Sequence, residues 1–584
     1  MKDTVTLVMI VKNESQNLGT CLDSVKNHID EIVIVDTGST DSTLDVASRY
    51  TDKVYTYPWN GDFAAARNYA IARAGGDWIL SLDADESLIC APGQLKELVR
   101  RKNNIDAYML PLLYPVAECT GEYNQFLVLR LFRNKKGYQF RGKIHEQVVV
   151  HNNEVVEIAD DIVIKHNMAS PKERNRKRGR NLAALKKAYL EDPTNYFLQY
   201  YLGIEWLGLA KPDKALPFLQ NAYRNLTDDH LLFRAPTLRY LLICLNILGQ
   251  LDEMICLSLE AALKYPDYTD IYYLGGIALE EKKEYKIAVK WFDQAIQCGV
   301  PPSIYSHMNG TGSFLALYHM GFCYEKLGMP ENAQACYERA LHENNQYIYP
   351  AGNLFLLILK KRGPRYTLEY FKEKGYLNNL RLALTVADLF FLAGYPDLSE
   401  RCLGRCSVSS DKSEEVFFQL GRYNIYSGRL KKGLNYMEQI PEGSDFFIDG
   451  QTHKAVALLL MGRFNDCRSL GLQMWKNKLT RTTARVILSL SRSMQDGQSP
   501  DASTKFIGAD LIRASLNILD LCYHYLPGKS TEGSHLTQII NILESIIRRS
   551  IPMGDRALQE YYQDRTNSLR EFFDYKFGNG GIRT

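Results

Sequence analysis

The sequence feature that constrains the fold most is an alternation of strand and helix signals over the first 82 residues. Short apolar runs at 6–11, 31–35, 53–57 and 77–82 are separated by segments with helical spacing of apolar residues. This βαβαβαβ order predicts a parallel sheet with right-handed crossovers. The sequence therefore begins with an α/β domain of a nucleotide-binding type.

Polar residues follow these strands at the points where they end. Asn13 and Glu14 follow the first strand, and Asp36 follows the second. Asp83 and Asp85 follow the fourth strand and share a strand parity, so both can face the edge where α/β sheets bind ligands. Two converging carboxylates repel each other unless a cation neutralises them, and oxygen ligands suit Mg²⁺ or Mn²⁺. The alternative for an isolated D-x-D pattern is a turn that closes a strand.

The first 170 residues contain neither a G-x-G-x-x-G pattern nor a P-loop signature, so a dinucleotide site and a P-loop site are both unsupported. Instead, four motifs follow one another at residues 8–14, 31–41, 62–68 and 77–86. At this spacing they resemble the motifs of family 2 glycosyltransferases with the GT-A fold. The resemblance covers about residues 1–170.

The resemblance implies that a nucleotide sugar lies across the sheet. By this analogy, Asp36 holds the uracil or ribose side, Asp83 contacts the ribose, and Asp85 binds the metal that bridges the diphosphate. Lys12 stands where many relatives carry a tyrosine, so a possible base-stacking ring is missing. The implied donor-binding residues are Val11, Asn13, Glu14, Asp36, Asp62, Arg67, Asp83 and Ala84.

Two of these residues also have a purely structural interpretation. Asp62 precedes an alanine-rich helical segment and is a good N-cap residue. Arg67 belongs, on the same interpretation, to the exposed polar face of that helix.

The resemblance also implies a catalytic base and a second metal ligand downstream. GT-A enzymes place an acidic residue after the metal motif as general base, and often a later histidine as a metal ligand. Glu146 and His166 have the matching order, so the expected base is Glu146 and the expected ligand is His166. His145 could exchange roles with either of them.

A basic stretch at 172–180 follows this domain, and strand signals stop near residue 170. The stretch could cover the donor diphosphate, but the favoured interpretation is a solvated linker helix. Aromatic residues are not interleaved with its basic ones, so the sequence predicts no nucleic-acid partner.

The rest of the chain shows an internal repeat that resembles tetratricopeptide repeats. A glycine is followed after twelve residues by one alanine and after seven more by another, which predicts closely packed helix pairs. The segment 301–312 is expected to be a loop that interrupts the solenoid. The three units are Gly203, Ala215 and Ala222; Gly276, Ala288 and Ala295; and Gly321, Ala333 and Ala340.

We therefore expect an α/β GT-A domain with a mostly parallel sheet, followed by an all-α tetratricopeptide-like solenoid. Further helices are expected at 511–525, 536–548 and 556–575. The expected divisions are a catalytic domain at 1–170, a basic helical linker that leads into the repeats at 171–200, a repeat array at 200–480, and a helical cap or dimer region at 481–584.

The leading functional hypothesis is a metal-dependent, inverting glycosyltransferase that uses a UDP-sugar such as UDP-glucose. The GT-A and repeat arrangement resembles sublancin-type enzymes, which glycosylate Cys or Ser of a precursor peptide. This implies a peptide or protein acceptor, modified on Ser, Thr or Cys and held by the repeat array. The alternatives are a polysaccharide or lipid-linked glycan acceptor, and a non-enzymatic scaffold in which a degenerate sheet supports the repeat array. For the array itself, the alternative is that it only supports the catalytic domain or forms a homodimer.

Composition bears mainly on the compartment. Twelve cysteines occur without a C-x-x-C pattern, which favours a reducing environment over a disulfide framework. The first apolar run is too short for a signal peptide, and no run approaches the roughly 20 residues that span a bilayer. These features predict a cytoplasmic protein without a membrane span.

Overall fold

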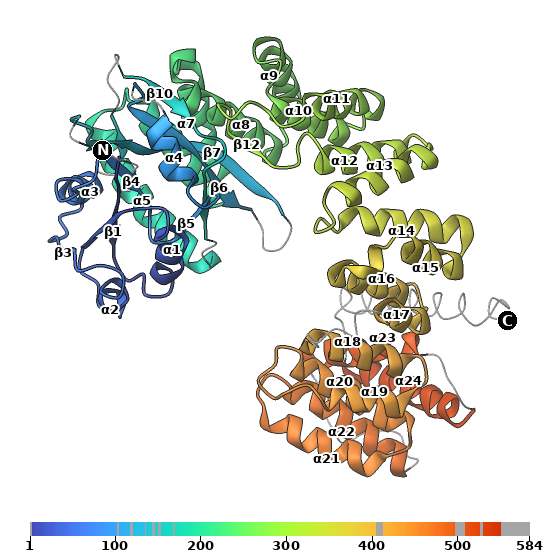
Figure 1. Ribbon diagram of the computed structural model, residues 1–584. Coiled ribbons are helices and arrows are strands. Elements are labelled where there is room, and N and C mark those ends of the chain that lie inside the picture. The colour runs from blue at the N-terminus through green and yellow to red at the C-terminus, as the bar shows by residue number, and fades with distance from the viewer. Residues whose placement is uncertain are drawn as a thin grey trace. The chain divides into compact units, whose positions relative to one another are not determined.

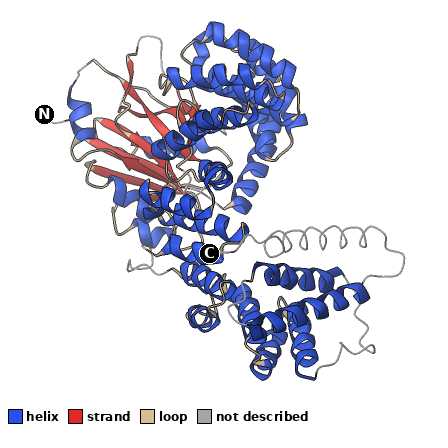
Figure 2. Ribbon diagram, turned by 90° about the vertical axis from the view of Figure 1, so that its right-hand side faces the viewer, coloured by secondary structure: helices blue, strands red, loops and turns tan. Residues whose placement is uncertain are grey.

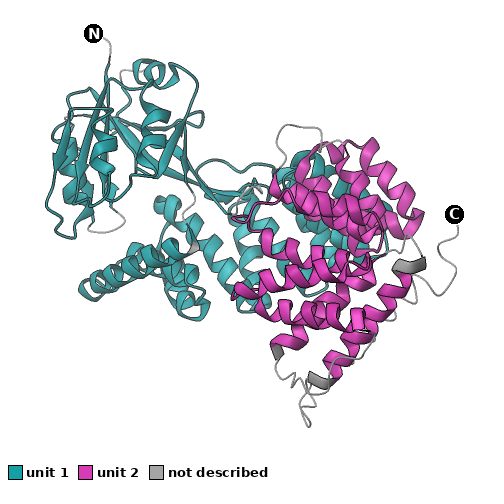
Figure 3. Ribbon diagram, turned by 90° about the horizontal axis from the view of Figure 1, so that it is seen from below, with its two compact units in different colours: residues 1–347 teal, residues 348–584 magenta. Residues whose placement is uncertain are grey.

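The chain forms two compact units, residues 1–347 and 348–584, which Figure 3 colours separately. The computed structural model describes residues 3–101, 104–116, 121–134, 136–142, 146–149, 154–167, 170–404, 413–496, 509–525 and 530–550.

The first unit contains a ten-stranded sheet, drawn red in Figure 2, with the strand order β3-β2-β1-β4-β7-β6-β11-β5; β10 pairs with β6 and β12 with β7. Strands β3, β2, β1 and β4 are parallel, as the sequence predicts, whereas β7 runs antiparallel to β4 and β6. Its strands are β1 (Val5–Val11), β2 (Glu31–Asp36), β3 (Val54–Thr56), β4 (Trp78–Ser81), β5 (Glu86–Ile89), β6 (Ala107–Pro115), β7 (Tyr123–Arg133), β10 (Val156–Ile158), β11 (Val163–His166) and β12 (His307–Met308), and a separate two-stranded sheet pairs β8 (Phe140–Arg141) with β9 (Gln147–Val148).

Both faces of β1 and β4 are buried, which explains why these strands read as continuous apolar runs. On β1, Leu7 packs in one core cluster with Leu22 of a helix on one face. The neighbouring Val8 packs in another cluster with Ala64 and Ala70 of a helix on the opposite face. The helices of the sheet domain are α1 (Leu18–Val25), α2 (Thr43–Ala47), α3 (Phe63–Ile71) and α4 (Gln94–Arg101).

The same unit continues into paired helices (Figure 1). These are α5 (Pro171–Glu191), α6 (Tyr196–Gly208), α7 (Pro212–Asn225), the 3₁₀ turn η1 (Asp228–His230), α8 (Leu231–Ile247), α9 (Leu251–Lys264), α10 (Thr269–Glu281), α11 (Tyr285–Cys298), α12 (Phe314–Lys326) and α13 (Pro330–Glu343).

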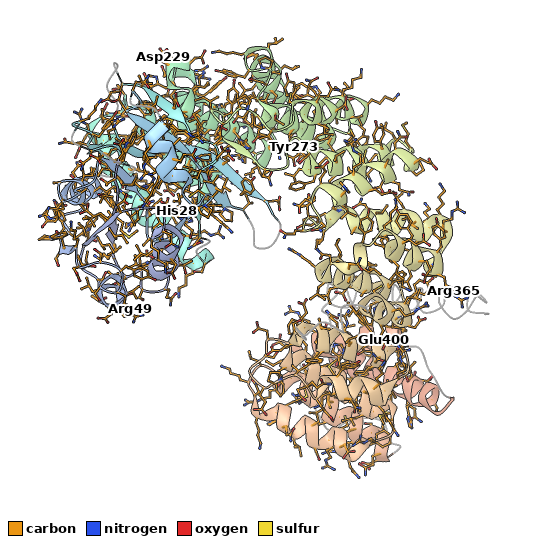
Figure 4. All side chains as sticks on the ribbon, viewed as in Figure 1. His28, Arg49, Asp229, Tyr273, Arg365 and Glu400 are labelled. Atoms are coloured by element: carbon orange, nitrogen blue, oxygen red, sulfur yellow. The ribbon has the colours of Figure 1, made fainter. Side chains whose placement is uncertain are left out.

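The repeat glycines lie where two helices of a pair touch. A Cβ atom on Gly276 of α10 would come within 2.7 Å of Phe292 on α11, and one on Gly321 of α12 within 2.6 Å of Tyr337 on α13. Tyr273 of α10, labelled in Figure 4, also packs against Phe292, with 6.0 Å between the ring centroids. The sequence-based prediction of a helical solenoid with close contacts at these glycines is confirmed.

The segment 301–312 differs from the expected loop, because its residues His307 and Met308 form β12. This short strand pairs antiparallel with Gln125 and Asn124 of β7, so part of the helical array adds a strand to the sheet. The sequence gives little sign of a strand this short.

The second unit is helical throughout its described residues. The predicted helices near 511–525 and 536–548 are confirmed, and the one at 556–575 lies outside the described residues. None of the described helices is long and apolar enough to span a membrane. The elements are α14 (Tyr349–Arg362), α15 (Pro364–Glu373), η2 (Tyr376–Asn378), α16 (Leu380–Leu392), α17 (Pro396–Leu403), α18 (Glu414–Tyr426), α19 (Leu430–Met437), α20 (Phe447–Leu460), α21 (Phe464–Lys476), α22 (Arg481–Asp496), α23 (Ala509–His524) and α24 (Ser530–Ser550).

Candidate active site

A cavity of about 650 Å³ opens at the carboxyl ends of β1 and β4, within the first unit. Side chains of the sheet line one side, and side chains of α5, α6 and α8 line the other. The structure brings eight predicted site residues together around this space. They are Val11, Glu14, Arg67, Asp83, Ala84, Asp85, Glu146 and His166.

Arg67 holds two of the predicted acidic residues in place. Its Nη2 donates to Asp83 Oδ1 at 2.5 Å and its Nε to Glu146 Oε1 at 2.6 Å, while Nη1 lies 3.4 Å from Ser81 Oγ. Only 6% of Arg67 is exposed, so the alternative interpretation of an exposed helix face is wrong for this residue. A buried guanidinium needs such partners to offset its lost hydration.

A second arginine, Arg130 of β7, completes this network. Its Nη2 lies 3.1 Å from Asp83 Oδ2 and 3.0 Å from Glu86 Oε1. Burial alone would raise the pKa of Asp83, but Arg67 and Arg130 outweigh it and hold that pKa well below its usual range. Burial raises the pKa of Glu86, whose other oxygen accepts from the Asp83 backbone N–H.

Glu146 lies at the cavity wall, with 11% of its side chain exposed. Arg67 holds Oε1, and no described residue donates a hydrogen bond to Oε2. A carboxylate fixed by one oxygen and open at the other is suited to accept a proton from a group in the cavity.

Asp85 and His166 lie next to each other, with 3.5 Å between Asp85 Oδ2 and His166 Nε2. The His166 ring packs against Tyr114, and its buried Nδ1 has no hydrogen-bond partner among the described residues. Lys177 of α5 also reaches Asp85 Oδ2, at 3.1 Å. Burial lowers the pKa of Lys177, but Asp85 and Glu14 outweigh that effect and raise it.

This pair fits a divalent cation that also binds substrate oxygens. One carboxylate and one imidazole point their ligand atoms into the same space, and such ions commonly take one or two protein ligands plus phosphates. Within the described part of the chain, no group of three or more His, Cys, Asp and Glu side chains could hold a metal by itself. Asp85 and His166 would therefore be the ligands that the described residues offer such an ion, and substrate oxygens would add others.

Two of the loops at the strand ends are tied together by Asn13. It adopts a left-handed conformation with φ 56°, which asparagine tolerates better than most residues. Its N–H donates to Ser39 Oγ at 2.9 Å, and its Oδ1 accepts from the Thr40 N–H at 2.7 Å. Asn13 lines an adjoining cavity of about 350 Å³.

Asp36 and Asp62 line neither cavity. The buried Asp36 carboxylate accepts from the backbone N–H groups of Gly38 and Ser39 and so shapes the turn after β2. Asp62 is the N-cap of α3 and accepts from the Ala65 N–H at 3.0 Å. Their contacts with the donor remain predictions, and His145 lies outside the described residues.

Sequence reasoning missed Arg130, Glu86 and the role of Lys177. Arg130 is a charged residue inside an otherwise apolar part of β7, a signal that could have marked it as a paired or functional group. Lys177 lies in the basic stretch for which a solvated linker helix was favoured, and its contact with Asp85 corrects that interpretation for this residue.

Comparison with known proteins bears on the family of the sheet domain. Residues 6–156 match the family model for glycosyl transferase family 2, which confirms the resemblance seen in the motifs. The SPbeta prophage-derived glycosyltransferase SunS of Bacillus subtilis is 29% identical over 291 residues, which cover 47% of this chain and 67% of that protein.

A TPR repeat-containing protein of Synechococcus elongatus is 41% identical over 144 residues, or 25% of this chain. The match spans only 35% of that relative's length. Among solved structures, a crystal structure of MamA is similar at 20% identity with a TM-score of 0.25, over 30% of this chain and 94% of that one.

Proposed function

We propose that this chain is an inverting, metal-dependent glycosyltransferase that transfers a sugar from a UDP-sugar to a Ser, Thr or Cys side chain of a peptide or protein. The observation that carries the proposal is the convergence of Asp83, Asp85, His166 and Glu146 on one cavity in a family 2 domain. Inversion needs a base on the acceptor side and a stabilised leaving group on the other side of the anomeric carbon.

In this proposal each residue has one task. Glu146 takes the acceptor proton on Oε2, while Arg67 fixes its position through Oε1. Asp83, held by Arg67 and Arg130, is oriented to accept hydrogen bonds from the donor's ribose. Asp85 and His166 would hold Mg²⁺ or Mn²⁺, which stabilises the charge that develops on the departing diphosphate.

The second wall of the cavity supports an acceptor held by the array. Tyr200 and Tyr201 of α6 and Phe233 of α8 line the same space as Glu146, and Tyr201 Oη accepts from Gln147 at 3.0 Å. An acceptor that reaches Glu146 along this wall contacts repeat helices. Aromatic side chains there suit apolar parts of a peptide.

Calorimetric titration with UDP, with and without Mn²⁺, tests the donor site. The wild type should bind UDP in a metal-dependent manner, and Asp85→Ala should abolish the metal dependence. Asp52→Ala removes the same charge from an exposed turn and should bind as the wild type does. A folded wild type that binds no UDP would contradict the proposal.

Incubation with UDP-glucose and a library of Ser-, Thr- and Cys-containing peptides, followed by mass spectrometry, tests the acceptor. Peptides that gain a hexose support the proposed acceptor class. Donor turnover that leaves every peptide unmodified, but modifies an added glycan, would instead favour a polysaccharide acceptor.

A further inference from the structure

Helix α5 presents three cations toward the candidate donor site. Arg176, Lys177 and Arg180 line the cavity of about 350 Å³, together with the aromatic side chains of Trp59 and Phe63. Lys177 and Arg180 also line the 650 Å³ cavity, so the two spaces share a wall. Residues four apart on a helix lie on one face, which places Arg176 and Arg180 side by side.

The position of α5 is fixed from both sides. Toward the array, Arg178 Nη1 and Asn181 Nδ2 donate to Glu205 of α6, at 3.1 and 3.0 Å. Toward the sheet, the guanidinium of Arg180 lies 5.5 Å from the centroid of the Phe63 ring at the start of α3. The helix that begins the array is therefore also a wall of the nucleotide-binding edge.

The carboxylates of Glu14 and Glu173 line the same cavity, but they form no ion pair with the arginines on this wall among the described residues. Lys177 pairs with Asp85 and, at 3.8 Å, with Glu173, but neither Arg176 nor Arg180 forms an ion pair with any described residue. Burial and the neighbouring Arg176 lower the pKa of Arg180 and outweigh the opposite effect of Glu205. A cation in this setting is stabilised when an anion enters the cavity.

We infer that Arg176, Lys177 and Arg180 bind the diphosphate of the nucleotide-sugar donor. The inference rests on the proposed function and adds a binding role for the first array helix. The two guanidinium groups provide forked donors that match phosphate oxygens, and Lys177 adds a point charge. On donor binding Lys177 exchanges the Asp85 carboxylate for a phosphate oxygen, which leaves Asp85 free to bind the cation.

Calorimetry with UDP and with uridine tests this assignment. Arg180→Ala and Arg176→Ala should each weaken UDP binding roughly 10- to 100-fold, as expected for a lost charge-assisted hydrogen bond, and should leave uridine binding unchanged. The UDP affinity of Arg180→Lys should lie between that of the wild type and that of Arg180→Ala, because lysine keeps the charge but lacks the paired N–H donors of a guanidinium group. Lys187→Ala, which removes an exposed cation of α5 that lines neither cavity, should bind as the wild type does.

The outcomes separate this inference from the proposed function. Suppose that Asp85→Ala loses metal-dependent UDP binding while Arg176→Ala and Arg180→Ala bind UDP as tightly as Lys187→Ala. The proposed donor site is then supported, and the proposed role of α5 is wrong. If uridine and UDP weaken equally, the arginines act on structure and not on phosphate, which also contradicts the inference. If the wild type binds no UDP, both proposals fail together.

Discussion

At the scale of single residues, the site depends on one buried arginine. All three nitrogens of the Arg67 guanidinium group contact other side chains, and two of those partners are the carboxylates of Asp83 and Glu146. The sequence motif implied that Arg67 lines the donor pocket. Its geometry adds a positioning role, because one rigid guanidinium group sets the distance between the carboxylates of Asp83 and Glu146.

Glu146→Gln tests the base directly. The amide keeps the size of the side chain and an oxygen for Arg67, but it cannot take a proton, so the sugar-transfer rate should fall roughly 10²- to 10⁴-fold. UDP affinity should change little. Single-turnover transfer and UDP calorimetry measure the two effects separately.

Glu97→Gln is the matched control for that variant. Glu97 also pairs with an arginine, Arg101, but on the exposed surface of α4. A Glu146→Gln enzyme with the transfer rate of Glu97→Gln would exclude Glu146 as the base.

At the scale of elements, small residues determine how closely the paired helices pack. Gly276 and Gly321 each face an aromatic ring of the partner helix. The twelve- and seven-residue spacing identified these positions from sequence, because a helix pair repeats its contacts at fixed intervals.

Replacing Gly276 by alanine should therefore destabilise the protein, although alanine is the better helix former. The added Cβ would lie 2.7 Å from Phe292, and overpacking of this kind costs about 1–3 kcal/mol. Gly352→Ala should stabilise by up to about 1 kcal/mol, because Gly352 lies in α14 with no atom near the new Cβ. Thermal unfolding should therefore give a lower melting temperature for Gly276→Ala and a higher one for Gly352→Ala than for the wild type.

The elements of the sheet domain were predictable where the signal is local in the chain. Asp83 and Asp85 end a buried strand, and that pattern together with the three preceding motifs predicted them at the site. Arg130 and Lys177 were not predictable in the same way, because they meet those aspartates across 47 and 92 residues of sequence. A charged residue in a strand or helix does not reveal its distant partner.

At the scale of the whole molecule, the sheet and the helical array of the first unit are connected by β12 and by the contacts of a buried ion pair. Arg239 of α8 and Asp270 of α10 lie 2.8 Å apart with almost no exposure, and Arg239 also bonds Asn124 of β7. Asp270 further accepts from the Met308 N–H of β12 at 3.0 Å. Sheet and array therefore share polar contacts that neither satisfies alone.

Asp270→Asn should destabilise the first unit by about 3–5 kcal/mol, because it leaves Arg239 buried without its counter-charge. Hydrogen exchange at the Met308 amide should also speed up. Asp252→Asn changes an exposed pair with Lys282 and should shift stability by less than about 0.5 kcal/mol. Equal effects of the two variants on unfolding would contradict the linking role of Asp270.

The strand that the array adds to the sheet, at His307 and Met308, also limits where segments of this chain can be exchanged with those of a relative. A crossover near residue 170 would separate β7 from its added strand and Asp85 from Lys177. A crossover after residue 347 leaves those partners in one parental segment. Chimaeras, and gene fusions in nature, should therefore tolerate exchange of the helices beyond that point far better than exchange of the first array helices.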